Sequence, residues 1–193
     1  LTKGLIGEMN AYLLGMILVG KILMTALSRA DMPSEQRKDF YLYIDEFQNF
    51  TTDSICSILS EARKYGLNLI IAHQYLGQLV TQGNNTQIRD AVFGNVGTWL
   101  LFKIGSEDAE IMEKEFAPVF NKYDLINIEK YTAYVKLLID NTASRPFSMA
   151  TPWPLPGIKR EEIASRIKTL SRLKHGQDRN IIEAEIRRRT IAA

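Results

Sequence analysis

Two adjacent acids follow an apolar run in the first half of this 193-residue chain. Asp45 and Glu46 come directly after Phe40–Ile44, whose apolar, aromatic and β-branched side chains are typical of a buried strand in a parallel sheet. In nucleotide hydrolases, the first acid at such a strand end supports a hydrated Mg²⁺ and the second polarises the attacking water, which is the Walker B pattern. An isolated acidic pair is also explained if Asp45 caps the next helix and Glu46 is solvated. The choice between these two explanations depends on the rest of the sequence.

A glutamine follows the next predicted strand, residues 67–72. Because the carboxyl ends of parallel strands meet at one edge of a sheet, we expect Gln74 to lie near Asp45 and Glu46. An amide at that edge can hydrogen-bond a γ-phosphate or its water without adding charge, and so report the nucleotide state to the following loop. We interpret His73 as a packed or surface imidazole rather than a catalytic base.

Two cations, Arg63 and Lys64, stand near the end of the helix predicted between these strands. One explanation is that they complement the helix dipole, an effect of ~0.3 to 1 kcal/mol. The other is that Arg63 reaches across a subunit boundary to a neighbour's γ-phosphate, because its planar fork suits developing phosphoryl charge. From spacing alone, the first explanation is favoured.

Segments of helical and strand periodicity alternate along the chain, which predicts an α/β layer fold with a largely parallel sheet flanked by helices. The predicted strands are residues 40–44, 67–72, 98–104 and 131–139, with 147–150 as an edge hairpin on the last. The predicted helices are residues 7–29, 52–65, 88–93 and 106–116, with N-cap candidates at 51–53 and Gly66 as the C′ residue of the second. Because Asn10 and Lys21 interrupt its apolar run, we predict that the first helix is buried rather than membrane-spanning.

Three prolines within residues 151–157 predict the end of the main domain, which we place at 1–157. Residues 158–193 form a basic tail with 10 basic and 5 acidic side chains, predicted to be helical at 159–175 and 178–191. The body carries 14 basic and 17 acidic side chains. One cysteine excludes an intrachain disulfide, and one cysteine with two histidines disfavours a zinc site.

Four stretches together resemble a known family: YLYIDEFQNF, SEARKYGLNLIIAHQYLGQL, IRDAVFGNVG and GSEDAE. They look like the C-terminal part of the motor domain of TraG/TraD-type coupling proteins of conjugation and type IV secretion, within the FtsK/HerA group of RecA-like motors. The resemblance covers residues 1–150. It implies a RecA-like fold, ATP and Mg²⁺ as cofactors, a ring of six, and transport of single-stranded DNA or an attached relaxase towards a secretion channel in the membrane.

By this resemblance, Asp45 and Glu46 match the Walker B acids, and Asp45 would hold Mg²⁺ through water. Gln74 matches the nucleotide-sensing motif, and Arg63 matches the position proposed as a trans-acting arginine finger. The sequence departs from the family in having no G-x-x-x-x-G-K-[ST] phosphate cradle. We therefore expect a fragment truncated before its P-loop, inactive alone and without a transmembrane segment. The full-length protein is then an ATPase at the cytoplasmic face of the inner membrane.

Candidate DNA contacts are the polar loop 82–87, Arg89 and the basic run 187–189, although for each of them taken singly a solvated surface is the favoured explanation. Two other functions stay open. One is a non-enzymatic module that docks a secretion or relaxosome partner, and the other is a DNA-packaging or segregation motor of the same superfamily. IRDAVFGNVG and GSEDAE favour conjugation.

Overall fold

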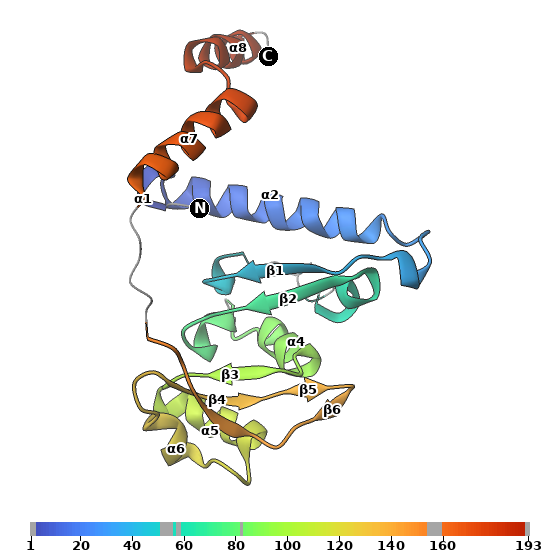
Figure 1. Ribbon diagram of the computed structural model, residues 1–193, viewed down its shortest axis with the longest axis vertical. Coiled ribbons are helices and arrows are strands. Elements are labelled where there is room, and N and C mark those ends of the chain that lie inside the picture. Colours follow the sequence, from blue (N-terminus) through green and yellow to red (C-terminus); the bar gives the residue numbers. More distant parts are fainter. Residues whose placement is uncertain (1–2, 51–55, 57–58, 82, 154–159, 192–193) are drawn as a thin grey trace. The chain divides into compact units, whose positions relative to one another are not determined.

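The computed structural model describes residues 3–50, 56, 59–81, 83–153 and 160–191. The chain divides into two units, Leu1–Thr151 and Pro152–Ala193. The helices of the first unit are α1 (Lys3–Ile6), α2 (Glu8–Leu27), α4 (Gln87–Asn95), α5 (Ser106–Phe116) and α6 (Lys122–Ile126), with 3₁₀ helices η1 (Ser34–Gln36), η2 (Phe47–Phe50), η3 (Ala62–Tyr65) and η4 (Leu76–Leu79). Its strands are β1 (Phe40–Ile44), β2 (Leu67–Ile71), β3 (Trp99–Leu101), β4 (Thr132–Lys136), β5 (Leu138–Ile139), β6 (Thr142–Ala143) and β7 (Phe147–Ala150), shown in Figure 1.

Strands β1 and β2 pair in parallel, from Phe40 opposite Leu67 to Ile44 opposite Ile71. The hydrogen bonds continue past both carboxyl ends, because the Ala72 amide donates to the Ile44 carbonyl at 3.0 Å and the Phe47 amide donates to the Ala72 carbonyl at 2.9 Å. The two strands therefore end side by side. This register brings the residues that follow each strand to one edge.

The prediction of a largely parallel sheet is not confirmed. Among the described strands, only β1 and β2 are parallel, whereas β3, β4 and β7 form an antiparallel sheet and β5 pairs antiparallel with β6. The chain leaves β3, passes through α5 and α6, and returns along β4 in the opposite direction. The predicted pairing of residues 147–150 with the preceding strand is confirmed by β4 and β7.

Helix α2 begins and ends within two residues of its predicted bounds, but the prediction that it is buried is wrong. Only Ala11, Gly15 and Ala26 of this helix are buried. The apolar residues of α2 are spread around the helix instead of forming one stripe. Only a narrow side of the helix can therefore face the β1–β2 layer. By length and composition α2 could cross a membrane, a test that helices packed on soluble proteins also pass.

The helix predicted over residues 52–65 is described only in part. Its proposed N-caps at 51–53 lie outside the described residues, while residues 59–61 are helical and η3 follows directly. Gly66 has φ of 74°, and its amide donates to carbonyls of Ala62 and Arg63, which confirms it as the residue that ends this helix. A Cβ at Gly66 would also lie 3.0 Å from the Lys38 carbonyl oxygen.

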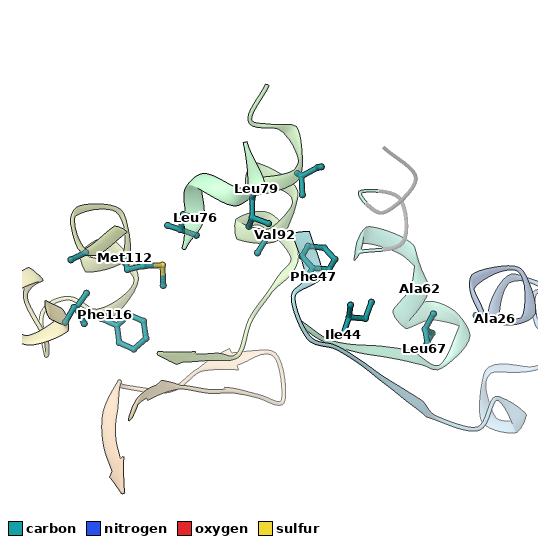
Figure 2. Packing of buried hydrophobic residues seen from close by; sticks show 13 residues of the cluster. Ala26, Ile44, Phe47, Ala62, Leu67, Leu76, Leu79, Val92, Met112 and Phe116 are labelled. Carbon is teal, nitrogen blue, oxygen red and sulfur yellow. The ribbon is translucent and has the colours of Figure 1, made fainter. Parts of the chain in front are cut away.

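Buried side chains anchor the segments that follow β1 and β2 at their carboxyl ends (Figure 2). Ile44 and Phe47, on either side of the acidic pair, are 6% and 0% exposed. Leu76 and Leu79 of η4 are 3% and 0% exposed and join the same cluster. Polar residues at this edge are therefore flanked by side chains anchored in the core.

The second unit contains α7 (Glu161–His175) and α8 (Arg179–Ile191), as predicted for the tail. Neither helix has a buried residue. Exposed pairs four residues apart, Glu162 with Arg166 and Glu183 with Arg179, support them by only a few tenths of a kcal/mol each.

Gly15 permits a close contact between α2 and the Phe50 ring of η2. A Cβ added there would overlap the ring of Phe50, whereas a Cβ at Gly20 would meet no atom within 4 Å. We expect Gly15→Ala to lower the free energy of unfolding by about 1 to 3 kcal/mol. In the matched Gly20→Ala variant, the better helix propensity of alanine should raise it by about 0.5 to 1 kcal/mol. Urea unfolding measures both, and equal behaviour of the two variants would contradict the contact.

Candidate functional site

Asp45 and Glu46 occupy the turn between β1 and η2. Asp45 is exposed, and its Oδ1 accepts a hydrogen bond from the Glu46 amide at 3.0 Å. Glu46 is half-buried and has φ of 51°, in the left-handed region that side chains other than glycine and asparagine rarely adopt. The chain turns sharply at this point, and the Asn49 amide donates back to the Glu46 carbonyl at 3.0 Å.

Two amide side chains hold the carboxylate of Glu46. Gln74 Nε2 donates to Glu46 Oε1 at 2.7 Å, across the edge formed by the ends of β1 and β2. Gln48 Nε2 donates to Glu46 Oε2 at 2.6 Å, from two residues along the same chain segment. The structure thus brings Asp45, Glu46 and Gln74 together at one rim, as their positions after parallel strands require.

The segment after β2 connects this rim to α5. Gln78 Oε1 accepts from the backbone amides of Gln74 and Tyr75, at 3.1 and 3.2 Å. The Leu76 amide donates to Asp108 Oδ2 at 3.1 Å, in the first turn of α5. Residues 72–79 therefore contact Glu46 at one end and α5 at the other.

His73 lies half-buried between two carboxylates. Burial lowers the pKa of His73 below its ordinary value, while Asp108 and Glu46 act in the opposite direction with less effect. The interpretation of His73 as a packed imidazole agrees with this environment. Because burial disfavours its charged form, the neutral imidazole is favoured at pH 7.

Arg63 lies on η3, before β2 begins, whereas Gln74 follows β2. The structure therefore places Arg63 at the opposite end of the strand and does not bring it to the acidic rim of its own chain. Its side chain is exposed, with one guanidinium nitrogen 3.4 Å from Asn141 Oδ1. Arg63 therefore does not join Asp45, Glu46 and Gln74 at the rim of its own chain, and its place in the last turn of η3 agrees with the helix-dipole explanation.

Two other arginines hold the end of η3. Arg37 donates to the Lys64 carbonyl at 2.6 Å, and its guanidinium lies 5.4 Å from the centre of the Tyr65 ring. Arg29 donates to the Tyr65 carbonyl at 3.0 Å and to the Lys38 carbonyl at 2.8 Å. The carbonyls at the end of η3 are thus satisfied by cations, as a helix C-terminus favours.

The candidate DNA contacts are dispersed. Residue 82 of the polar loop lies outside the described residues, and residues 83–87 lead into α4. Arg89 forms an ion pair with Asp90 at 3.4 Å. The basic run 187–189 lies on α8 in the second unit, where Arg189 pairs with Glu185.

The carboxylates at the rim suit a hard cation. Within the described part of the chain, no three His, Cys, Asp or Glu side chains are grouped closely enough to enclose a metal ion. Mg²⁺ commonly keeps several waters and takes only one or two carboxylates from the protein, with phosphates completing its shell. The exposed Asp45 carboxylate, an oxygen donor at the end of β1, fits that requirement.

Sequence reasoning missed Gln48 and Asp108 as parts of the site. Gln48 stands two residues after Glu46, and only the left-handed turn at Glu46 returns its amide to that carboxylate. Asp108 was visible as an acid in the first turn of a predicted helix, but nothing in its spacing indicates a contact with Leu76.

The class of fold is shared with solved coupling proteins. The plasmid coupling protein TrwB, in complex with the non-hydrolysable ATP analogue ADPNP, matches with a TM-score of 0.56 at 15% identity, over 75% of this chain and 38% of that one. The unbound monoclinic form of the bacterial conjugative coupling protein TrwBΔN70 gives 0.53 at 15% identity, over 70% and 37%. At such identity the likeness establishes a shared fold, and the chain spans little more than a third of these structures. A comparison with curated proteins found no match.

The family comparison is more specific. Residues 39–125 match the family described as the TraM recognition site of TraD and TraG. This range includes Asp45, Glu46, Arg63 and Gln74. The family match and the shared fold together support a TraG/TraD-type coupling protein fragment, as the sequence resemblance predicts.

The depressed pKa of His73 gives a prediction for stability against pH. The unfolded chain binds this proton at a higher pH than the folded chain, so acidification favours unfolding. We expect the stabilising contribution to be complete above the unfolded pKa of ~6.5 and to be lost as the pH falls through the folded value. His73→Gln should remove this part of the pH dependence between pH 7.5 and 5, measured by urea unfolding. The matched His175→Gln variant, on exposed α7, should retain it, and a His73→Gln profile parallel to the parent would contradict the assignment.

Proposed function

We propose that this chain is part of an ATP-driven coupling protein that transports single-stranded DNA, or a DNA-bound relaxase, in conjugation. The observation that carries the proposal is the hydrogen bond between Gln74 Nε2 and Glu46 Oε1. It joins a carboxylate suited to accept a proton and an amide suited to contact a phosphate, at the carboxyl edge of parallel strands. The TrwB structure in complex with an ATP analogue supports a nucleotide as the ligand of this fold.

Each rim residue has a distinct chemical part in this proposal. Glu46 orients the attacking water and takes its proton on a carboxylate oxygen. Asp45 would hold a hydrated Mg²⁺ through water, and the ion when bound would neutralise charge on the β- and γ-phosphates. Gln74 exchanges its hydrogen bond with Glu46 for one with the γ-phosphate, so its position depends on the nucleotide.

The rest of the machinery lies outside this sequence. The β- and γ-phosphates require a G-x-x-x-x-G-K-[ST] cradle, which the full-length protein would supply. In a ring of six at the cytoplasmic face of the inner membrane, Arg63 would reach the γ-phosphate of the neighbouring subunit. Its place at the far end of β2 from Gln74 supports a contribution in trans.

A second candidate function is a non-enzymatic docking module for a relaxosome or secretion partner. The observation in its favour is the family description, which names TraM recognition for residues 39–125. The two functions differ in whether Glu46 has to retain an ionised carboxylate.

Glu46→Gln in the full-length protein tests this difference. The amide cannot accept the proton of water, so we expect steady-state ATP hydrolysis to fall by about 10² to 10⁴-fold while nucleotide binding is retained. Phosphate release and binding of a fluorescent ATP analogue provide the two measurements. The matched control is Glu107→Gln, an exposed acid on α5. Multi-turnover hydrolysis by Glu46→Gln would contradict the role of Glu46 as the base, whereas a parent protein that hydrolyses no ATP would favour docking.

Mixed rings test the role of Arg63. Rings of Arg63→Ala alone should lose roughly 10³-fold in hydrolysis, which is the scale of an arginine finger. Mixing them with Glu46→Gln subunits should restore hydrolysis at interfaces where one subunit supplies the glutamate and the other supplies the arginine. Lys64→Ala, the adjacent exposed cation, serves as the matched control. If mixing restores nothing, Arg63 does not act in trans.

A further inference from the structure

The two amides on Glu46 differ in how firmly they are held. Gln48 is half-buried and belongs to η2, which begins at the fully buried Phe47. The Phe47 amide is hydrogen-bonded to the Ala72 carbonyl, so η2 is tied to the end of β2. The backbone that carries Gln48 is therefore fixed on both the core side and the sheet side.

Gln74 is held differently. Its side chain is exposed, and it stands in the segment between β2 and η4 rather than in a helix or strand. Its own backbone amide is held by the side chain of Gln78. Its sequence neighbours are half-buried His73 and exposed Tyr75, so no adjacent side chain anchors Gln74 in the core.

The hydrogen bonds divide between the two carboxylate oxygens. Gln74 contacts Oε1 at 2.7 Å, and Gln48 contacts Oε2 at 2.6 Å. A carboxylate held by a donor on each oxygen is fixed in orientation and has fewer lone pairs available for water. If the donor on Oε1 leaves, the donor on Oε2 still fixes the plane of the group.

From this division we propose that Gln48 is the positioning residue for Glu46, a proposal that rests on the proposed ATPase. Gln48 keeps Oε2 in place throughout, while the departure of Gln74 to the γ-phosphate removes its hydrogen bond from Oε1, which then accepts one from the attacking water. Oε1 is then the oxygen that takes the proton. Gln48 touches neither nucleotide nor water and acts only through the orientation of Glu46.

The test is Gln48→Leu in the full-length protein, which keeps most of the side-chain volume and removes the donor. Misplacing a reacting group by about 1 Å costs up to ~10²-fold, so we expect kcat for ATP hydrolysis to fall roughly ten- to hundred-fold. KM for ATP and the Kd of an ATP analogue should not change, because Gln48 does not contact the nucleotide. Gln36→Leu, the same substitution at an exposed glutamine of η1, should leave kcat as in the parent.

Gln48→Asn keeps the amide but shortens its reach, and it provides the answer if the leucine variant does not fold. Both should lose kcat alone, and a folded variant of either kind with the parental kcat would overturn the positioning role. A rise in KM or Kd together with the loss of kcat would also overturn it, since that pattern indicates general damage to the site. Glu46→Gln measured alongside separates the two proposals: if it abolishes hydrolysis while Gln48→Leu does not, only the role of Gln48 fails.

Discussion

The parallel register of β1 and β2 is the constraint on which the candidate site depends. Because Ile44 lies opposite Ile71, the residues that follow each strand emerge side by side, and the backbone hydrogen bonds continue to Ala72 and Phe47. A shift of one residue would turn each side chain of β1 to the other face of the sheet. Burial of Ile44 and Phe47 on both sides of the acids opposes such a shift, because it would expose them to water.

The polar groups at this edge form a connected set rather than isolated side chains. Glu46 accepts from amides on two different segments, and the second of these segments continues to Asp108 of α5. Partly buried carboxylates need such donors, because an unsatisfied charged group away from water costs several kcal/mol. The two amide donors satisfy both oxygens of the Glu46 carboxylate at a position next to the core.

Several elements of the fold and one contact of the candidate site could be predicted from the sequence. The strand at 40–44, the helix at 106–116, the end of a helix at Gly66 and the meeting of Glu46 with Gln74 follow from periodicity, glycine chemistry and strand order. The antiparallel course of β3, β4 and β7 could not be read, because a buried apolar strand gives the same pattern in either direction. The exposure of α2 was missed because a run of apolar residues does not tell which partner covers it. The contact of Gln48 depends on the left-handed backbone at Glu46, and a glutamate at that position does not predict this conformation.

The segment from Gln74 to Leu76 is attached at each end by a single hydrogen bond to a carboxylate, Glu46 at one end and Asp108 at the other. A hydrogen bond to a charged group contributes about 1.5 to 3 kcal/mol. Differences of 1 to 3 kcal/mol are those by which one ligand commonly changes the affinity for another at a distant site. Loss of the hydrogen bond between Gln74 and Glu46 would therefore change the free energy of this segment by an amount on the scale of the coupling between two sites.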